Sequence, residues 1–363
     1  MTTLPLELVE NIWIVLLTIH ALSKSALLCL GHGSLAADPT CSKTFCDLLR
    51  SPDCTFLPHV RSINNLKHYG SHDYAIYDKI PRDLAQLVSV RELEMTVMAP
   101  YVLEKLHTFL RTSFPRITRL ILDLRNVNHP GSTLLANVIC FFPALQGVVI
   151  RTIAVLEGIP VLVVPPRGLC SLSFCQNSVG QMLLWMEAAG QLSNVHTLTL
   201  PCLRGSDIPI VRKTLRQIGN QLNHLDLTLS GGLEGVETLQ MIDLSLHQNL
   251  HTLRIQDLSR IHSNAQETIL WIPRLIMQLR TPALERLTLA LSLCWPPYEM
   301  FDWAALDAFL SPARFPCLRS VVIKCEYHGD KFFYTQGRKL DMHESVYKAL
   351  PVLADSGVLR TEW

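Results

Sequence analysis

The stretch Gln221–Leu229, QLNHLDLTL, decides the fold of this 363-residue chain. Its leucines follow the pattern L-x-x-L-x-L-x-L. From Leu225 onward every second residue is apolar. This alternation predicts a short strand with one buried face, because successive side chains of a strand point to opposite sides of a sheet. The polar side chains between the leucines are then expected on the accessible face.

The same pattern recurs along most of the chain. Its copies centre on Leu93, Leu120, Val148, Leu172, Leu198, Leu225, Leu253, Leu287 and Val321. A weaker opening copy, HVRSINN, surrounds Ile63. The first seven copies follow one another at intervals of 24 to 28 residues, and the last two intervals are 34 residues each. Nine copies at such spacing make chance a poor explanation.

Leucine-rich repeats have about this period, with a strand and a helix in each repeat. We therefore expect an α/β leucine-rich-repeat solenoid, with strand–helix repeats of about 24–34 residues that bury their apolar faces on one another. Asn177 alone falls where such repeats usually carry an Asn after the strand, so the solenoid should be irregular.

Helical patterns separate the expected strands. Apolar residues at helical spacing predict helices over 101–112, 179–192 and 210–222. Ser263 and Gln266 form a capping-box pattern at the start of a helix that continues to Leu279, and Pro273 should kink it.

Composition limits the function classes. Hydrophobic residues make up 48% of the chain, as the continuous apolar interior of a solenoid requires, and 32 Lys and Arg nearly balance 31 Asp and Glu. No overall basic field indicates a nucleic-acid partner. The apolar run over 12–19 is too short for a membrane span and has no preceding positive charge, so we expect neither a signal peptide nor a membrane partner. Eleven scattered cysteines favour reduced thiols in a cytoplasmic or nuclear protein.

The opening stretch over 3–13, TLPLELVENIW, predicts an amphipathic helix. Pro5 suits the first helical turn, and Leu4, Leu8 and Ile12 repeat every four residues along one face. Such a helix either caps the first repeat or docks onto a partner.

The sequence LPLELVENIW resembles the first helix of the F-box. The stretch over 45–63, FCDLLRSPDCTFLPHVRSI, resembles the segment that follows the F-box in many fungal F-box proteins with leucine-rich repeats, and the C-terminal stretch over 347–363 resembles the closing segment of that group. The chain departs from the family over 20–44, where the Trp and Arg usual in the second half of the box are missing. The box is therefore degenerate or truncated.

The resemblance implies a division into an F-box-like helical segment at 1–44, a connection and N-terminal cap at 45–82, a solenoid at 83–330 and a C-terminal cap at 331–363. It also implies that Leu4, Pro5, Leu8 and Ile12 bind a Skp-type adaptor, and through it a cullin scaffold, while the repeats hold a target protein for ubiquitin transfer. The alternative is a repeat scaffold outside any ligase, whose N-terminal helix is only a cap.

No motif indicates catalysis or a cofactor. The chain contains neither G-x-x-x-x-G-K-[ST] nor G-x-G-x-x-G, and neither G-x-S-x-G nor H-E-x-x-H. Cys41, Cys46, Cys54 and His59 could supply four zinc ligands, but the tight C-x2-C pair of most structural zinc sites is missing, which favours packed residues. We expect no enzyme activity, no cofactor and no metal.

The accessible strand face is the expected partner surface. Its row of polar side chains comprises Arg119, Asp123, Arg151, Thr197, Thr199, His224, Asp226, Thr228, Arg254, Gln256, Arg286, Thr288 and Lys324. The candidates for partner binding are Arg119, Thr199, Asp226, Arg254 and Arg286. Their mixed charge suits a protein partner better than a phosphate backbone, although any single one is also explained as an ordinary solvated residue.

Overall fold

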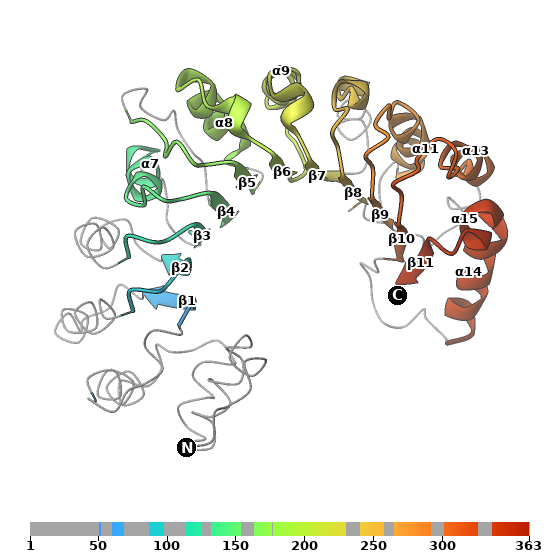
Figure 1. Cartoon of the computed structure of the whole chain (residues 1–363), viewed down its shortest axis with the longest axis horizontal. Helices are drawn as coiled ribbons and strands as arrows, with labels where there is room; N and C mark the ends of the chain where they lie inside the picture. The colour runs from blue at the N-terminus through green and yellow to red at the C-terminus, as the bar shows by residue number, and fades with distance from the viewer. Residues whose placement is uncertain are drawn as a thin grey trace. The chain divides into compact units, whose positions relative to one another are not determined.

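The computed structural model describes residues 51, 60–68, 87–97, 114–124, 132–153, 163–175, 177–229, 240–257, 265–291, 301–325 and 336–362 (Figure 1). Two compact units divide the chain, Met1–Leu169 and Cys170–Trp363. Both are α/β and solenoid-like, with parallel strands that follow one another in chain order.

The first unit contains four described strands and one described helix. The strands are β1 (Ser62–His68), β2 (Glu92–Val97), β3 (Arg119–Asp123) and β4 (Gly147–Thr152), and the helix is α7 (Ser132–Cys140). Each strand pairs in parallel with the next. The opening copy around Ile63 is thus confirmed as a strand.

The second unit contains seven described strands, all parallel. They are β5 (Ser171–Ser173), β6 (Thr197–Leu200), β7 (His224–Leu229), β8 (Thr252–Asp257), β9 (Arg286–Leu291), β10 (Ser320–Cys325) and β11 (Leu359–Glu362). The connections contain α8 (Val179–Ala188), α9 (Ile208–Ile218), α11 (Ala265–Ile276), α13 (Trp303–Phe309), α14 (Gln336–Ala349) and α15 (Pro351–Asp355), with 3-10 turns at Leu192–Asn194, Gly219–Gln221 and Leu244–Leu246. The helices lie on one side of the strands (Figure 1).

The repeat is visible in the strand register. Leu198, Leu225, Leu253, Leu287 and Val321 pair across five neighbouring strands, and all are buried. Ahead of most strands, two successive N–H groups donate to one carbonyl of the preceding repeat. At β7 these are Asn223 and His224, which donate to His196 at 2.8 and 3.0 Å. The predicted strands are therefore confirmed together with their spacing.

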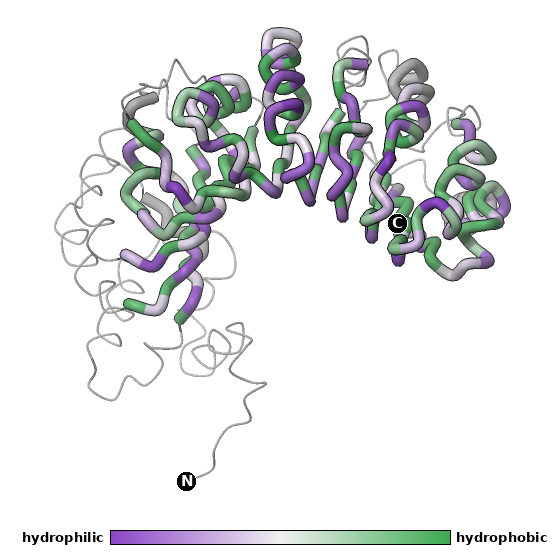
Figure 2. The backbone as a smooth tube through the Cα atoms, turned by 45° about the horizontal axis from the view of Figure 1, so that its top comes forward, coloured by the Kyte–Doolittle hydropathy of each residue, from purple (hydrophilic) through white to green (hydrophobic). Residues whose placement is uncertain are grey.

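The helices fit the predicted pattern in part. Val211, Leu215 and Ile218 of α9 are buried as expected, and green and purple segments alternate along this part of the chain (Figure 2). The prediction of a helix to Leu222 was wrong, because Gly219 has a φ of 53° and ends α9. Likewise α8 ends at Ala188, ahead of Gly190 with a φ of 68°.

Two further predictions concern α11 and the opening segment. The helix α11 continues past Pro273 to Ile276, and Met277 donates to the Pro273 carbonyl at 2.9 Å. The helices expected over 3–13 and 101–112 lie outside the described residues. The C-terminal segment adds β11, a strand that the sequence analysis did not predict.

Candidate partner-binding groove

The accessible strand face of the second unit forms a groove of about 520 Å³. We call it the strand-face groove. It is lined by Thr197, Leu198, Thr199, His224, Leu225, Asp226, Thr252, Leu253, Arg254, Arg286, Thr288, Ser320, Val322, Lys324, Arg360 and Glu362. These residues come from six consecutive strands, β6 to β11. Within each strand, the alternate polar residues face the groove, and the leucines between them are buried. Side chains from separate repeats therefore lie on one continuous surface.

Short side chains form the floor of the groove over β9 and β10. Thr288, Ser320 and Val322 line it, yet each is less than 9% exposed, whereas Arg286 at the start of β9 is exposed. Small or short-branched side chains between long cationic ones leave a depression. Its polar and apolar atoms are suited to an extended protein segment.

The groove contains more cationic than anionic side chains. Four cationic side chains and two anionic ones line it, which gives a net charge of +2 when His224 is neutral. Asp226 lies 3.7 Å from Arg254, and Glu362 forms an ion pair with Lys324. Neither Arg286 nor Arg360 forms an ion pair or a side-chain hydrogen bond with any residue that the structure describes. Among the described residues, these two exposed guanidinium groups thus have no anionic partner.

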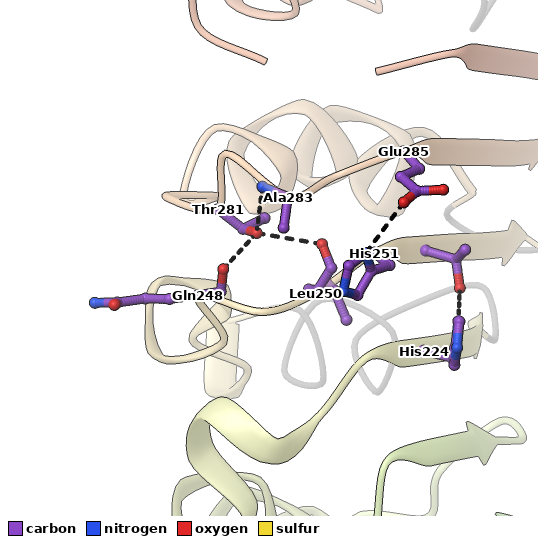
Figure 3. Close-up of polar contacts among 8 residues, drawn as sticks. His224, Gln248, Leu250, His251, Thr281, Ala283 and Glu285 are labelled. Carbon is purple, nitrogen blue, oxygen red and sulfur yellow. Dashed lines mark hydrogen bonds and ion pairs between the residues drawn. The ribbon is translucent and has the colours of Figure 1, made fainter. Parts of the chain in front are cut away.

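His224 contributes a neutral hydrogen-bonding side chain to the groove. Its Nδ1 lies 2.6 Å from the Thr252 hydroxyl (Figure 3). Burial lowers the pKa of His224, and the neighbouring His251 lowers it further. On the adjacent strand start, His251 lies 3.4 Å from the Glu285 carboxylate. At neutral pH the imidazole of His224 is therefore uncharged.

The structure brings four of the five predicted partner-binding residues together. Thr199, Asp226, Arg254 and Arg286 all line the strand-face groove. Arg119 lies on β3 in the other unit, 3.1 Å from Glu92.

The first unit has a different strand face. There Glu92 pairs with Arg119 and Glu94 pairs with Arg151. The charges of these two acidic and two basic side chains balance each other.

Sequence reasoning missed the polar or short side chains of Thr252, Ser320, Val322, Arg360 and Glu362 in this groove. The last two belong to β11, whose four residues LRTE are too short to show the repeat pattern. Ser320 and Val322 lie on a predicted strand, and the alternation around Val321 could have placed them on the accessible face.

Several other expectations fall outside the described residues. These are the adaptor-binding candidates Leu4, Pro5, Leu8 and Ile12 and the zinc candidates Cys41, Cys46, Cys54 and His59.

Among the described residues, no three His, Cys, Asp or Glu side chains are grouped to hold a metal ion, and no helix is long and apolar enough to cross a membrane. Cys140, Cys170, Cys175, Cys202 and Cys317 form no disulfide with any described residue; the first four are partly buried and Cys317 is exposed. Burial raises the pKa of Cys140 to about 11.

Comparisons with known proteins do not assign this chain to a family. No family model matches it, and no curated protein matches it. Its fold is similar to the crystal structure of a Bacteroides fragilis protein, with a TM-score of 0.36 and 15% sequence identity. The match covers 67% of this chain and 62% of the other.

Proposed function

We propose that this chain is a leucine-rich-repeat protein that binds a target protein in the strand-face groove. A more specific proposal is that it presents this target to a cullin-RING ubiquitin ligase through an F-box-like opening segment. The observation that carries the first part is the groove itself, a continuous mixed-charge surface over β6 to β11. The chain makes and breaks no bonds in this proposal. It raises the effective concentration of the target near the transferring enzyme.

The chemistry of the groove favours a protein over a nucleic acid. Asp226 and Glu362 lie in it beside the arginines, and both would repel a phosphate backbone. Threonine hydroxyls and Val322 offer hydrogen bonds and apolar contact, which is the mixture typical of protein interfaces.

The ligase part rests on the resemblance of the opening and closing segments to fungal F-box proteins. Leu4, Pro5, Leu8 and Ile12 would enter the groove of a Skp-type adaptor as a helix-in-groove contact. The second candidate function, a scaffold outside any ligase, is favoured by the missing Trp and Arg over 20–44.

A selection from a displayed library of 12-residue peptides tests the groove. The full chain, its Thr199→Trp variant and its Leu184→Trp variant serve as baits. Thr199 lines the groove, so an indole there should abolish enrichment, whereas Leu184 is 40% exposed on α8 and lies outside it. Equal enrichment by the full chain and by Thr199→Trp would remove the groove as the binding surface.

A pull-down with purified Skp-type adaptor tests the ligase part. The full chain should bind the adaptor, and the double variant Leu8→Asp, Ile12→Asp should not, because carboxylates cannot be buried in an apolar groove without a large cost. No binding by the folded, unsubstituted chain would leave the scaffold as the function.

A further inference from the structure

We infer that the strand-face groove selects an acidic segment of its protein partner, one in which two carboxylates lie three or four residues apart in an extended chain. The inference rests on the proposed function of the groove and specifies its ligand. Its starting point is the surplus of positive charge over β9, β10 and β11.

The four cations of the groove divide into two kinds. Arg254 and Lys324 have anionic neighbours in the groove itself, Asp226 at 3.7 Å and Glu362 in an ion pair. Arg286 and Arg360 are exposed, and no carboxylate of the described residues pairs with either. A ligand carboxylate can therefore bind these two guanidinium groups without displacing an existing ion pair.

The register sets the distance between the two arginines. Thr288 pairs with Val322, and Val322 pairs with Arg360, so Arg360 lies two strands and two residues away from Arg286. With about 4.8 Å between strands and 3.3 Å per residue, their Cα atoms are about 12 Å apart. An extended peptide covers this distance in three or four residues, and arginine side chains accommodate a small mismatch.

The floor between the arginines suits the backbone of such a peptide. Thr288, Ser320 and Val322 separate the two guanidinium groups and are too short to block a chain lying across them. Carboxylate–guanidinium hydrogen bonds are charge-assisted and often bidentate, so they would fix the position of the segment. The anions Asp226 and Glu362 disfavour a uniformly charged polymer, which has no means of avoiding them.

The test uses the same displayed library with further variants of the full chain. The bait Arg286→Gln, Arg360→Gln removes both available charges from the groove. The matched bait Arg216→Gln, Arg280→Gln removes two exposed charges of the same unit outside the groove. We expect the unsubstituted chain to enrich peptides with two Asp or Glu at the stated spacing. The first variant should weaken binding of a selected peptide about tenfold per arginine, and the second should leave it unchanged.

The outcomes separate this inference from the proposed function. Selected peptides that depend on Thr199 but show no excess of acidic residues, or that bind Arg286→Gln, Arg360→Gln equally well, would overturn the inference and leave the groove as a binding surface. The absence of any groove-dependent peptide would remove the proposed function as well. A 20-nucleotide single-stranded DNA that displaces the peptides and requires the same arginines would replace the acidic segment by a nucleic acid. Equal unfolding midpoints of all baits establish that each is folded.

Discussion

The imidazole Nδ1 of His247 lies 2.7 Å from the backbone carbonyl oxygen of Gly219, 28 residues earlier in the chain. Because a carbonyl only accepts hydrogen bonds, Nδ1 carries the proton and donates it. His247 is 1% exposed, so the bond is shielded from water. It joins the turn after α9 to the turn before β8 and so holds two consecutive repeats in register.

The burial of His247 predicts a loss of stability in mild acid, although the bond to Gly219 partly offsets the effect of burial on its pKa. Burial is the main reason why the pKa of His247 is lowered from its ordinary value of 6.5. As the pH falls through this value, the unfolded chain gains a proton at this site more readily than the folded chain, so the free energy of unfolding falls as pH decreases. At pH 7.5, His247→Gln should be less stable than the unsubstituted chain by about 1–3 kcal/mol, because a buried hydrogen bond and some packing are lost.

Urea unfolding at pH 7.5 and 5.5 measures the effect. The stability difference between the unsubstituted chain and His247→Gln should shrink at the lower pH, since the variant no longer titrates at this site. A difference independent of pH would mean that His247 does not titrate differently in the two states.

The other partner in this contact gives a second prediction. Gly219 has φ 53° and ψ −127°, a backbone conformation that residues with a Cβ rarely adopt, and nothing lies within 4 Å of an added Cβ. Gly219→Ala should therefore destabilise the chain by backbone strain alone, by about 1–3 kcal/mol. Ala at Gly205, whose φ is not in the left-handed region and whose Cβ would also meet open space, is the control, and it should unfold close to the unsubstituted chain. Equal unfolding midpoints for the two variants would contradict the argument.

Gly219 also shows a feature that the sequence pattern did not predict, the end of α9. Leu222 continues the apolar spacing of α9, so the pattern predicted a helix through it, but the backbone at Gly219 ends the helix and Leu222 is buried outside it. Periodicity reports which side chains are buried and says little about the dihedral angles that connect them. The strands around Leu225 and Leu253 could be predicted, since their burial and their period coincide.

The groove could be predicted only in part for a related reason. Thr199, Asp226 and Arg254 alternate with buried leucines, so their face follows from the pattern. Arg360 and Glu362 reach the groove because β11 pairs with β10, a contact across 38 residues that no local signal specifies. The same long-range pairing decides which of the four cationic side chains in the groove have an anionic neighbour.

A buried hydroxyl gives a third prediction. Thr281 is 1% exposed, and its Oγ1 donates to the Gln248 carbonyl at 2.6 Å, lies 3.2 Å from the Leu250 carbonyl and accepts from the Ala283 N–H at 3.3 Å (Figure 3). Thr281→Val keeps the shape but leaves these backbone groups without the hydroxyl, so it should cost about 1–3 kcal/mol in urea unfolding. Thr281→Ser keeps the hydroxyl and should cost less. A larger loss in Thr281→Ser than in Thr281→Val would assign the effect to packing of the methyl group instead.

The C-terminal end of the second unit depends on a buried carboxylate. Asp307 of α13 is 4% exposed, and its two oxygens accept from the N–H groups of Val352 and Leu353 at 2.9 and 3.0 Å. These N–H groups belong to the first turn of α15, where no helical carbonyl is available to them. The carboxylate therefore caps α15 across 45 residues and positions the segment that leads into β11.

Asp307→Asn tests this cap. An amide supplies one oxygen and turns an NH₂ group toward a backbone donor, so we expect a loss of about 1–3 kcal/mol in the free energy of unfolding. Amide hydrogen exchange at Val352 and Leu353 should accelerate more than exchange in β7, because the effect begins at α15. Asp355→Asn, an exposed carboxylate on α15 itself, should change neither quantity. If Asp307→Asn accelerated exchange equally in β7 and α15, the carboxylate would stabilise the unit as a whole and not this helix in particular.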